Sequence, residues 1–276
     1  MKAAVVGHVE WIDFVRVNRL PLAGEIIHAS EAWEEPGGGG AVAAVQLAKL
    51  AGGVSFFTAL ADTDLGRRSA LELEGLGVGV KTHFHTGIQR RAITYIDAQG
   101  ERTITALGKR FGPGVGDLLP WDELDETDCV YLSAGDSGAV KQARRARILV
   151  ATSRVVPLLA QAGVKLDALV GSAADPGEVY RPGDLDPPPK LVVKTAGAEG
   201  GTFQVEGSPA QSFKPAPLGG PVADTYGAGD SFAAGLTFAL AAGYSVEEAV
   251  GLAARCGAAV LSGRGPYAGQ LTAEDL

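Results

Sequence analysis

The feature that most constrains the fold of this chain is the alternation of short apolar runs with helical patterns along its second half. Apolar runs at 129–132, 148–150, 168–170 and 191–195 each have the length of a buried strand. Helical patterns around 141–147 and up to Leu159 separate the first three runs. Parallel strands need long crossover connections, which helices usually supply. The alternation therefore predicts an α/β fold with a mainly parallel sheet covered by helices on both faces.

The two ends of the chain extend this pattern. At the start, a strand at 2–6 precedes a helix at 41–50, a strand at 54–58 and a helix at 67–74. At the end, two helices are expected at about 231–242 and 246–261. Ser245 and Glu248 have the spacing of a capping box for the second of these helices.

Two β-rich segments, about 10–35 and 88–106, interrupt the alternation and contain no helical period. Turn-forming residues at 97–100 lie between two strand-like runs and predict a hairpin. We expect both segments to form a small sheet over one domain that spans residues 1–276. This lid either closes over a bound ligand or pairs with a second subunit to give a homodimer. Its apolar surface would come from Trp11, Phe14, Ile26, Ile93 and Tyr95.

Composition excludes several classes of protein. The net charge of −8 argues against nucleic acid or an anionic membrane as the main partner. Cys129 and Cys256 are far apart and belong to no CxxC pair, so neither a disulfide framework nor a zinc site is indicated. The sequence shows no secretory signal and no apolar run of membrane-spanning length. These features predict a cytoplasmic protein.

The sharpest motif is DTYGAGDSF at 224–232, which precedes an Ala-rich helix. Small residues at a helix start let backbone N–H groups converge on an anion, and the helix dipole favours negative charge there. A carboxylate in the first turn, here Asp230, then lies beside any phosphate that the loop holds. Phosphoryl transfer to a hydroxyl needs such a base and such an anion site.

This motif closely resembles the C-terminal signature D-T-x-G-A-G-D-S-F-x-A-G of the ribokinase-like (PfkB) carbohydrate kinases. Four more segments resemble family motifs in the family's order, and together they cover nearly the whole chain: RVNRLPLAGE at 16–25, GGGGAVAA at 37–44, GERT at 100–103 and TAGAEG at 195–200. The resemblance implies a three-layer α/β/α ribokinase-like domain with a lid. It also implies an ATP-dependent kinase for an alcohol group of a sugar or sugar-like molecule.

The resemblance assigns roles to individual residues. Asp230 would be the catalytic base, and the anion hole would be formed by Gly227, Ala228 and Gly229. The nucleotide would be bound by Thr195, Gly197, Gly200, Asp224 and Thr225. ATP and Mg²⁺ are the implied cofactors, and a monovalent cation requirement is common in the family. Asp175 and Glu178 compete for the family's metal-associated acidic position.

The acceptor side departs from the family. Many of its sugar kinases have Asn and Asp where this chain has Glu10 and Ile12, and Val42 replaces the Asn of the glycine motif. Asp13 is one residue late, which on a strand points its side chain to the other face unless a bulge intervenes. The acceptor contacts are therefore expected from Glu10, Ile12, Asp13, Gly38, Gly39 and Val42. Apolar side chains here predict an acceptor with few hydroxyls, because an unpaired hydroxyl costs about 1–3 kcal/mol.

Three other patterns give weaker evidence of function. Gly38-x-Gly40-x-x-Ala43 formally matches a dinucleotide fingerprint, but residues 31–36 before it are not expected to form a strand, and no acidic residue follows about 20 positions on at a strand end. No G-x-x-x-x-G-K-[ST] segment occurs, which excludes a P-loop kinase. His83 and His85 would share one face of a strand as a possible metal pair, yet no third ligand is evident in the sequence, so surface histidines are the favoured interpretation.

Two other functions stay open. One is a nucleoside or hydroxymethyl-pyrimidine type kinase on the same fold, which the apolar acceptor positions would suit. The other is a ligand-binding protein without catalysis. The presence of Asp230 argues against the second, because a pure binder has no need of a base.

Overall fold

The computed structural model describes residues 1–276 and contains two sheets. The larger sheet consists of β1 (Ala3–Val6), β4 (Val54–Ala61), β5 (Val78–His85), β8 (Cys129–Leu132), β9 (Ile148–Thr152), β10 (Ala168–Ser172), β11 (Leu191–Thr195), β12 (Gly201–Val205) and β13 (Gln211–Phe213). Its order is β13-β12-β11-β10-β9-β8-β1-β4-β5, and all pairs from β11 to β5 are parallel. Only β12 and β13 are antiparallel to their neighbours.

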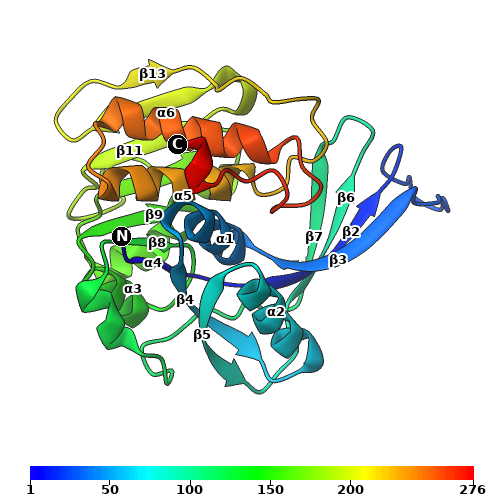
Figure 1. The fold of residues 1–276 in the computed structure, drawn as a ribbon, viewed down its shortest axis with the longest axis horizontal. Coiled ribbons are helices and arrows are strands. Elements are labelled where there is room, and N and C mark those ends of the chain that lie inside the picture. Colours follow the sequence, from blue (N-terminus) through cyan, green and yellow to red (C-terminus); the bar gives the residue numbers. More distant parts are fainter.

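Helices cover both faces of this sheet, which confirms the predicted three-layer α/β fold (Figure 1). The helices are α1 (Gly39–Ala51), α2 (Asp64–Gly75), α3 (Ser137–Ala143), α4 (Val156–Ala162), α5 (Ala228–Ala241) and α6 (Val246–Val260). Within β1, Val5 packs in the core with α1, α5 and α6, while Ala4 and Val6 pack with α3 and α4. None of the helices combines the length and apolar character needed to cross a bilayer.

Two helices differ from the sequence prediction. The α5 helix begins at Ala228, so part of the glycine-rich motif forms its first turn instead of preceding it. The α3 helix ends at Ala143, before the basic residues at 144–147. The Arg144 guanidinium donates to the carbonyl oxygens of Ala146 and Arg147 at 2.7 and 2.9 Å, which turns the chain toward β9. The predicted capping box of Ser245 and Glu248 is present at the start of α6.

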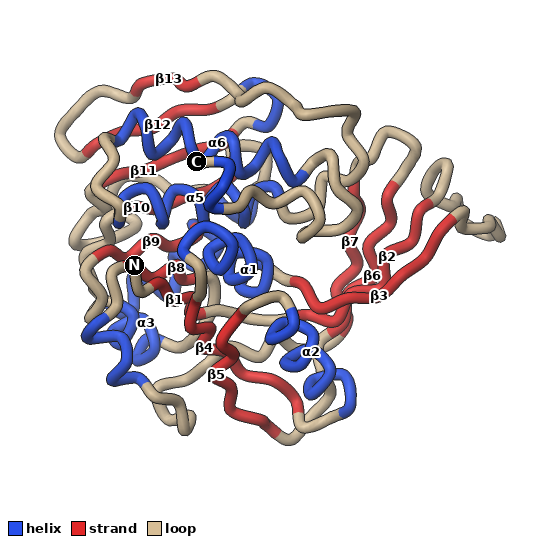
Figure 2. Tube along the Cα trace, viewed as in Figure 1, coloured by secondary structure: helices blue, strands red, loops and turns tan.

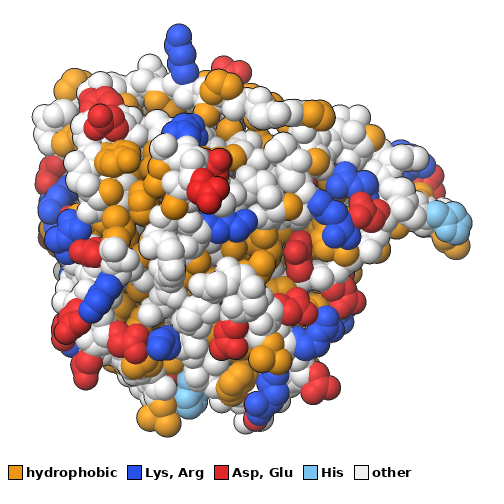
Figure 3. Space-filling view, viewed as in Figure 1, with side chains coloured by type: hydrophobic (Ala, Val, Ile, Leu, Met, Phe, Trp, Pro, Cys, Tyr) orange, Lys and Arg blue, Asp and Glu red, His pale blue; other side chains and the backbone are white.

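The smaller sheet is the predicted lid. It contains β2 (Glu10–Arg16), β3 (Glu31–Gly37), β6 (Arg91–Ile96) and β7 (Arg102–Leu107) in the order β3-β2-β6-β7. A parallel β2–β6 pair joins the two β-rich segments, which lie far apart in the sequence. The lid projects from one side of the main domain, at the right of Figures 1 and 3. Acidic, basic and apolar side chains are interspersed on the face shown in Figure 3.

The apolar surface of the lid differs from the expectation. Trp11 and Phe14 are buried, because Arg68 of α2 lies over the Trp11 ring at 4.3 Å and Phe14 stacks on Trp33 at 4.9 Å. Ile26 is exposed as expected, with 91% of its surface accessible, and Ile93 and Tyr95 are half-buried. Strand β7 is exposed along its whole length. Dimerisation through the lid stays a prediction.

Candidate active site

The carboxyl ends of the parallel strands face the lid, as the trace in Figure 2 shows for β1, which continues through residues 7–9 into β2. Ligands of open α/β sheets bind in the crevice at this edge. The residues after these strands are candidate site residues by position alone. They include His8 after β1, Ser133 after β8 and Arg154 after β9.

Gly227 turns the chain into α5. It is the N-cap of the helix, with φ of 84°, a conformation that favours glycine. A Cβ atom at this position would lie 3.0 Å from Val42 Cγ1 and 3.1 Å from Pro266 Cβ. Conformation and packing therefore both require glycine here, and the result is a tight start to the helix.

The first turn of α5 presents backbone amides without acceptors. The hydrogen bond from Ser231 N to Gly227 O, at 2.9 Å, closes this turn, and the amides of Ala228, Gly229 and Asp230 precede it. No side chain caps these amides. A Cβ on Gly229 would meet no protein atom within 4 Å. The space above this turn is therefore open, and the amides suit a phosphate group.

Asp230 lies in the same turn and is half-buried. Burial raises its pKa to about 7, and the neighbouring Glu178 adds to the increase. Arg102 and Arg154 act in the opposite direction. A general base works best with a pKa near the operating pH. The position of Asp230 beside the free amides therefore combines a base with an anion site.

The glycine motif at the start of α1 approaches this carboxylate. A Cβ on Gly39 would lie 2.7 Å from Asp230 Oδ1. Gly38 is buried, has φ of 87° and donates its amide to the Tyr226 hydroxyl at 2.9 Å. A Cβ on Gly40 would clash with the backbone of His8 at 2.7 Å. Of the two glycines expected at the acceptor, only Gly39 is partly accessible.

Asp224 and Thr225 brace the loop before α5. Asp224 is fully buried and accepts from the amides of Tyr226 and Gly265 at 2.8 and 3.2 Å. Thr225 donates to Glu101 of the lid at 3.0 Å, and its amide bonds to Gly100 O at 3.0 Å. Both residues were expected to bind nucleotide. In this structure Asp224 holds the loop in shape and Thr225 connects it to the lid, and nucleotide binding by either residue stays a prediction.

Glu10 lies at the base of the lid, and its carboxyl group is ionised at neutral pH. Burial alone would raise its pKa, but His8 and Arg90 lower it to about 2. Arg90 donates to Glu10 Oε1 at 2.6 Å, and His8 Nε2 lies 3.5 Å from the same atom. Glu10 is therefore already paired, and an acceptor hydroxyl would share the carboxylate with Arg90.

The other acceptor positions are less accessible than expected. Ile12 and Val42 are fully buried, and Ile12 Cδ1 lies 2.4 Å from the position of a Cβ on Gly37. Asp13 pairs with Arg91 at 2.8 Å. The register of β2 with β3 and β6 is continuous from Trp11 to Arg16, so no bulge turns Asp13 toward the side of Ile12. The usual sugar-binding carboxylate is not restored by Asp13.

On the side expected to bind nucleotide, Thr195 ends β11 and its hydroxyl lies 3.5 Å from Gly171 O. Gly197 is open, with no atom within 4 Å of a Cβ. Gly200 has φ of 81°, and a Cβ there would clash with Phe213 O at 2.1 Å. Gly200 is thus required by the chain reversal into β12, whereas Thr195 and Gly197 remain available at the edge.

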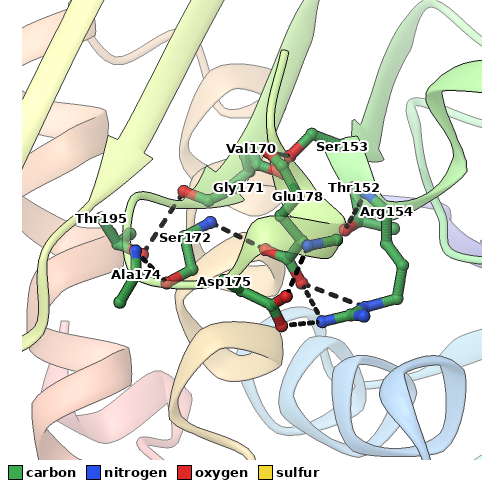
Figure 4. Close-up of polar contacts among 11 residues, drawn as sticks. Thr152, Ser153, Arg154, Val170, Gly171, Ser172, Ala174, Asp175, Glu178 and Thr195 are labelled. Atoms are coloured by element: carbon green, nitrogen blue, oxygen red, sulfur yellow. Dashed lines mark hydrogen bonds and ion pairs between the residues drawn. The ribbon is translucent and has the colours of Figure 1, made fainter.

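The two acidic candidates for metal binding meet at one arginine (Figure 4). Arg154 pairs with Glu178 Oε1 at 2.7 Å and with Asp175 Oδ2. The other oxygen of Glu178 accepts from Ser172 N at 2.7 Å, and Asp175 also accepts from Gly177 N at 2.7 Å. Of the two carboxylates, only Glu178 contributes to the raised pKa of Asp230. Glu178 therefore lies in the electrostatic range of the base.

Three residues of this site were missed from the sequence: Arg154, Arg90 and Tyr226. Arg154 follows β9 at the carboxyl edge of a parallel strand, a position that could have identified it. Tyr226 stands among small residues, and its hydroxyl connects the motif of α5 to that of α1 through Gly38. Arg90 carries no local signal, because its pairing with Glu10 depends on how β2 and β6 meet.

Comparison with solved structures shows a shared fold. A ribokinase from Thermotoga maritima superposes with a TM-score of 0.77 at 21% identity, covering 99% of this chain and 97% of that one. A ribokinase from Arabidopsis thaliana complexed with ribose and ATP gives 0.74 at 21% identity, with 99% and 96% covered. An adenosine kinase from Sinorhizobium meliloti gives 0.80 at 22% identity, with 99% and 98% covered.

No match was found among the curated proteins. The family model described as pfkB family carbohydrate kinase matches residues 1–162 and 185–273, which is most of the chain. The matched ranges include both lid segments and the DTYGAGDSF motif. The chain therefore belongs to the pfkB family of carbohydrate kinases and has the ribokinase-like fold.

Proposed function

We propose that this kinase transfers the γ-phosphoryl group of ATP to an alcohol group of a sugar or sugar-like acceptor, with Asp230 as the general base. One observation carries the proposal. The Asp230 carboxyl has a pKa of about 7 and lies in the helix turn whose amides have no acceptor. A base and an anion site in one turn are what phosphoryl transfer to a hydroxyl needs.

Each group has a separate role in the proposed reaction. Asp230 takes the proton of the acceptor hydroxyl as the hydroxyl oxygen attacks the phosphorus atom. The amides of Ala228, Gly229 and Asp230 donate to the oxygens of the transferring group, where negative charge is concentrated. Arg102 and Arg154, whose charges act on Asp230, favour an anion in the same place.

The nucleotide is proposed to lie along the carboxyl edge near Thr195 and Gly197. Mg²⁺, when bound, would neutralise charge on the β- and γ-phosphates. Oxygen ligands suit this ion, and both candidate carboxylates lie at the sheet edge. Glu178 fits the role better than Asp175, because Glu178 acts on the pKa of Asp230 and is less exposed. We expect activity to be lost in EDTA and restored by added Mg²⁺.

The acceptor is proposed to be poor in hydroxyl groups. Ile12 lies where many relatives have a hydroxyl-binding carboxylate, it is buried, and Asp13 pairs with Arg91 instead. Glu10 is a charged hydrogen-bond acceptor at the base of the lid, and its charge acts on the pKa of Asp230. Ribose and fructose should therefore be phosphorylated poorly. A nucleoside or hydroxymethyl-pyrimidine acceptor is the second candidate, since a less hydroxylated molecule does not need the hydroxyl-binding carboxylate that is missing at Ile12.

The test is ADP release, measured with ATP, Mg²⁺ and a panel of sugars, nucleosides and hydroxymethyl-pyrimidines. One acceptor class should stand out in kcat/KM. Asp230→Asn should keep ATP binding and lower turnover at least about 10²-fold, the low end for a general base. Near-wild-type turnover of the variant would remove Asp230 from the mechanism. ATP binding without ADP release for any acceptor would favour a non-catalytic binding protein.

A further inference from the structure

His83 and His85 occur on the edge strand of the main sheet, away from the chemistry described above. They are two residues apart on β5, so both rings lie on the same side of the strand. The ring centroids are 4.7 Å apart, at an angle of 68°. The sequence offered no third ligand for this pair, and two histidines alone rarely hold a metal ion.

The fold supplies the missing group. Asp117, in the loop that follows lid strand β7, lies against the histidines, with Oδ1 3.1 Å from His85 Nε2. One ligand atom from each of His83, His85 and Asp117 falls within 4.8 Å of the others. We propose that these three residues bind a divalent transition-metal ion, with Zn²⁺ as the best fit, and that water completes the coordination.

The carboxylate is held in place by its own loop. Its second oxygen accepts from Gly114 N at 2.7 Å, and the Asp117 side chain is only 10% exposed. Asp136 anchors the same loop by accepting from Val115 N at 3.1 Å. A fixed orientation of this kind is typical of carboxylates that ligate metals, whose remaining oxygen is hydrogen-bonded.

The imidazole rings need only a small adjustment. With bonds of about 2.0–2.1 Å, tetrahedral zinc requires ligand atoms about 3.3 Å apart. The His85–Asp117 contact of 3.1 Å already meets this distance. His83 is partly exposed on the edge strand, so its ring has room to turn toward the other two. Phe111 stacks on His85 at 5.8 Å and covers one side of the site.

The donor set separates this ion from the Mg²⁺ of the reaction. Imidazole nitrogen suits Zn²⁺, Cu²⁺ and Ni²⁺, whereas Mg²⁺ prefers oxygen ligands. The chain has few competing ligands, because His8 and both cysteines are buried. An ion bound here would connect the edge strand β5 to the loop that leaves the lid, and would stabilise the folded state by preferential binding.

The experiment is a calorimetric titration of tag-free, EDTA-treated protein with Zn²⁺, in buffer that contains Mg²⁺. The wild type should bind one Zn²⁺ per chain, with a higher midpoint of thermal unfolding. His83→Ala and Asp117→Asn should each weaken binding at least about tenfold. Asp117→Asn keeps an oxygen for Gly114, so its loop should persist. His28→Ala, which removes an exposed histidine of the lid, should bind Zn²⁺ as the wild type does.

A second readout reports the ligands directly. Co²⁺ in place of Zn²⁺ should give a visible absorption spectrum in the wild type and in His28→Ala, and this spectrum should be absent in His83→Ala. The proposal fails if Zn²⁺ does not bind, if excess Mg²⁺ displaces it, or if His83→Ala binds as tightly as His28→Ala. None of these outcomes depends on kinase activity.

Discussion

Asp230, in the first turn of α5, faces Gly39, in the first turn of α1, so closely that a Cβ on Gly39 would lie 2.7 Å from Asp230 Oδ1. Two helix N-termini thus converge on one carboxylate, although about 190 residues separate them in the sequence. The absence of a side chain at Gly39 leaves the space in which the carboxylate is held.

Gly39→Ala should therefore displace Asp230 while preserving the fold. A misplacement of about 1 Å can cost about 10²-fold in rate, so we expect a loss of that order in kcat. Gly53→Ala is the matched control, because a Cβ there meets no atom within 4 Å. Circular dichroism should show both variants folded. Normal kcat in Gly39→Ala would show that Asp230 tolerates the added methyl group.

The raised pKa of Asp230 predicts the pH dependence of activity. The base must be ionised, so kcat/KM should rise with pH through a midpoint near 7 and level off about one pH unit above it. In Asp230→Asn the residual rate should lose this step. A wild-type profile that is flat between pH 5 and pH 8, roughly the range that brackets this pKa, would contradict the assignment.

The raised pKa of Asp230 also predicts how the stability of the folded state depends on pH. The pKa of Asp230 is higher in the folded state than its ordinary value of 3.8, so the folded state binds more protons between about 4 and 7. The contribution of Asp230 to the stability of the folded state is complete at pH values below this window, and it is lost as the pH rises through the window. Asp230→Asn should therefore raise the thermal unfolding midpoint more at pH 8 than at pH 4. An equal change at both values would contradict the shift.

Charged residues that act on Asp230 should shift the midpoint of the pH–rate profile, and the direction should depend on the sign of their charge. Arg102→Met and Arg154→Met remove charges that favour the carboxylate, so the midpoint of the pH–rate profile should rise. Glu178→Gln removes a like charge and should lower it. Lys141→Met, on the exposed side of α3, removes one positive charge elsewhere and should leave the midpoint unchanged. A rise in Lys141→Met equal to that in the two arginine variants would point to net charge alone.

Gly229→Val should block the approach of the transferring phosphate to the amides of α5. Losing one anion-hole donor typically costs about 10²–10³ in rate. A Cβ at Gly229 meets nothing within 4 Å, so the first atom of the valine side chain has room in the protein itself. Gly251→Val, an equally open glycine within α6, should keep its activity. A nucleotide complex with its phosphates far from residues 227–229 would refute the anion hole.

The lid should pair two subunits through β7. Every residue of this edge strand is exposed, including Ile104 at 45% and Leu107 at 41%, and such an edge invites pairing with another strand. Light scattering should find a dimer for the wild type and a monomer for Ile104→Lys. Leu71→Lys, at an exposed apolar position on α2, is the control and should remain dimeric. A monomeric wild type would contradict pairing through β7 and would favour a lid that closes over the acceptor within one subunit.

Much of the fold was predictable from local patterns. Apolar runs of strand length, helical periods and the Ser245–Glu248 capping box depend on neighbours within a few residues, and the structure confirms them. The pairing of the lid segments followed from their lack of helical period. The start of α5 was misplaced by three residues, because a glycine-rich segment has little helix propensity of its own.

The sequence by itself determined the composition of the catalytic motif, with Asp230 three residues after Gly227. Only the tertiary structure decided what surrounds that motif. Gly39 approaches Asp230 because the starts of α1 and α5 converge, and the charge of Arg154 acts on Asp230 from the end of β9. The side-chain alternation of β2 keeps Asp13 away from the face of Ile12. Asp117 meets His85 through a loop whose path no local pattern encodes. Contacts of this kind depend on long-range packing, which spacing along the chain does not reveal.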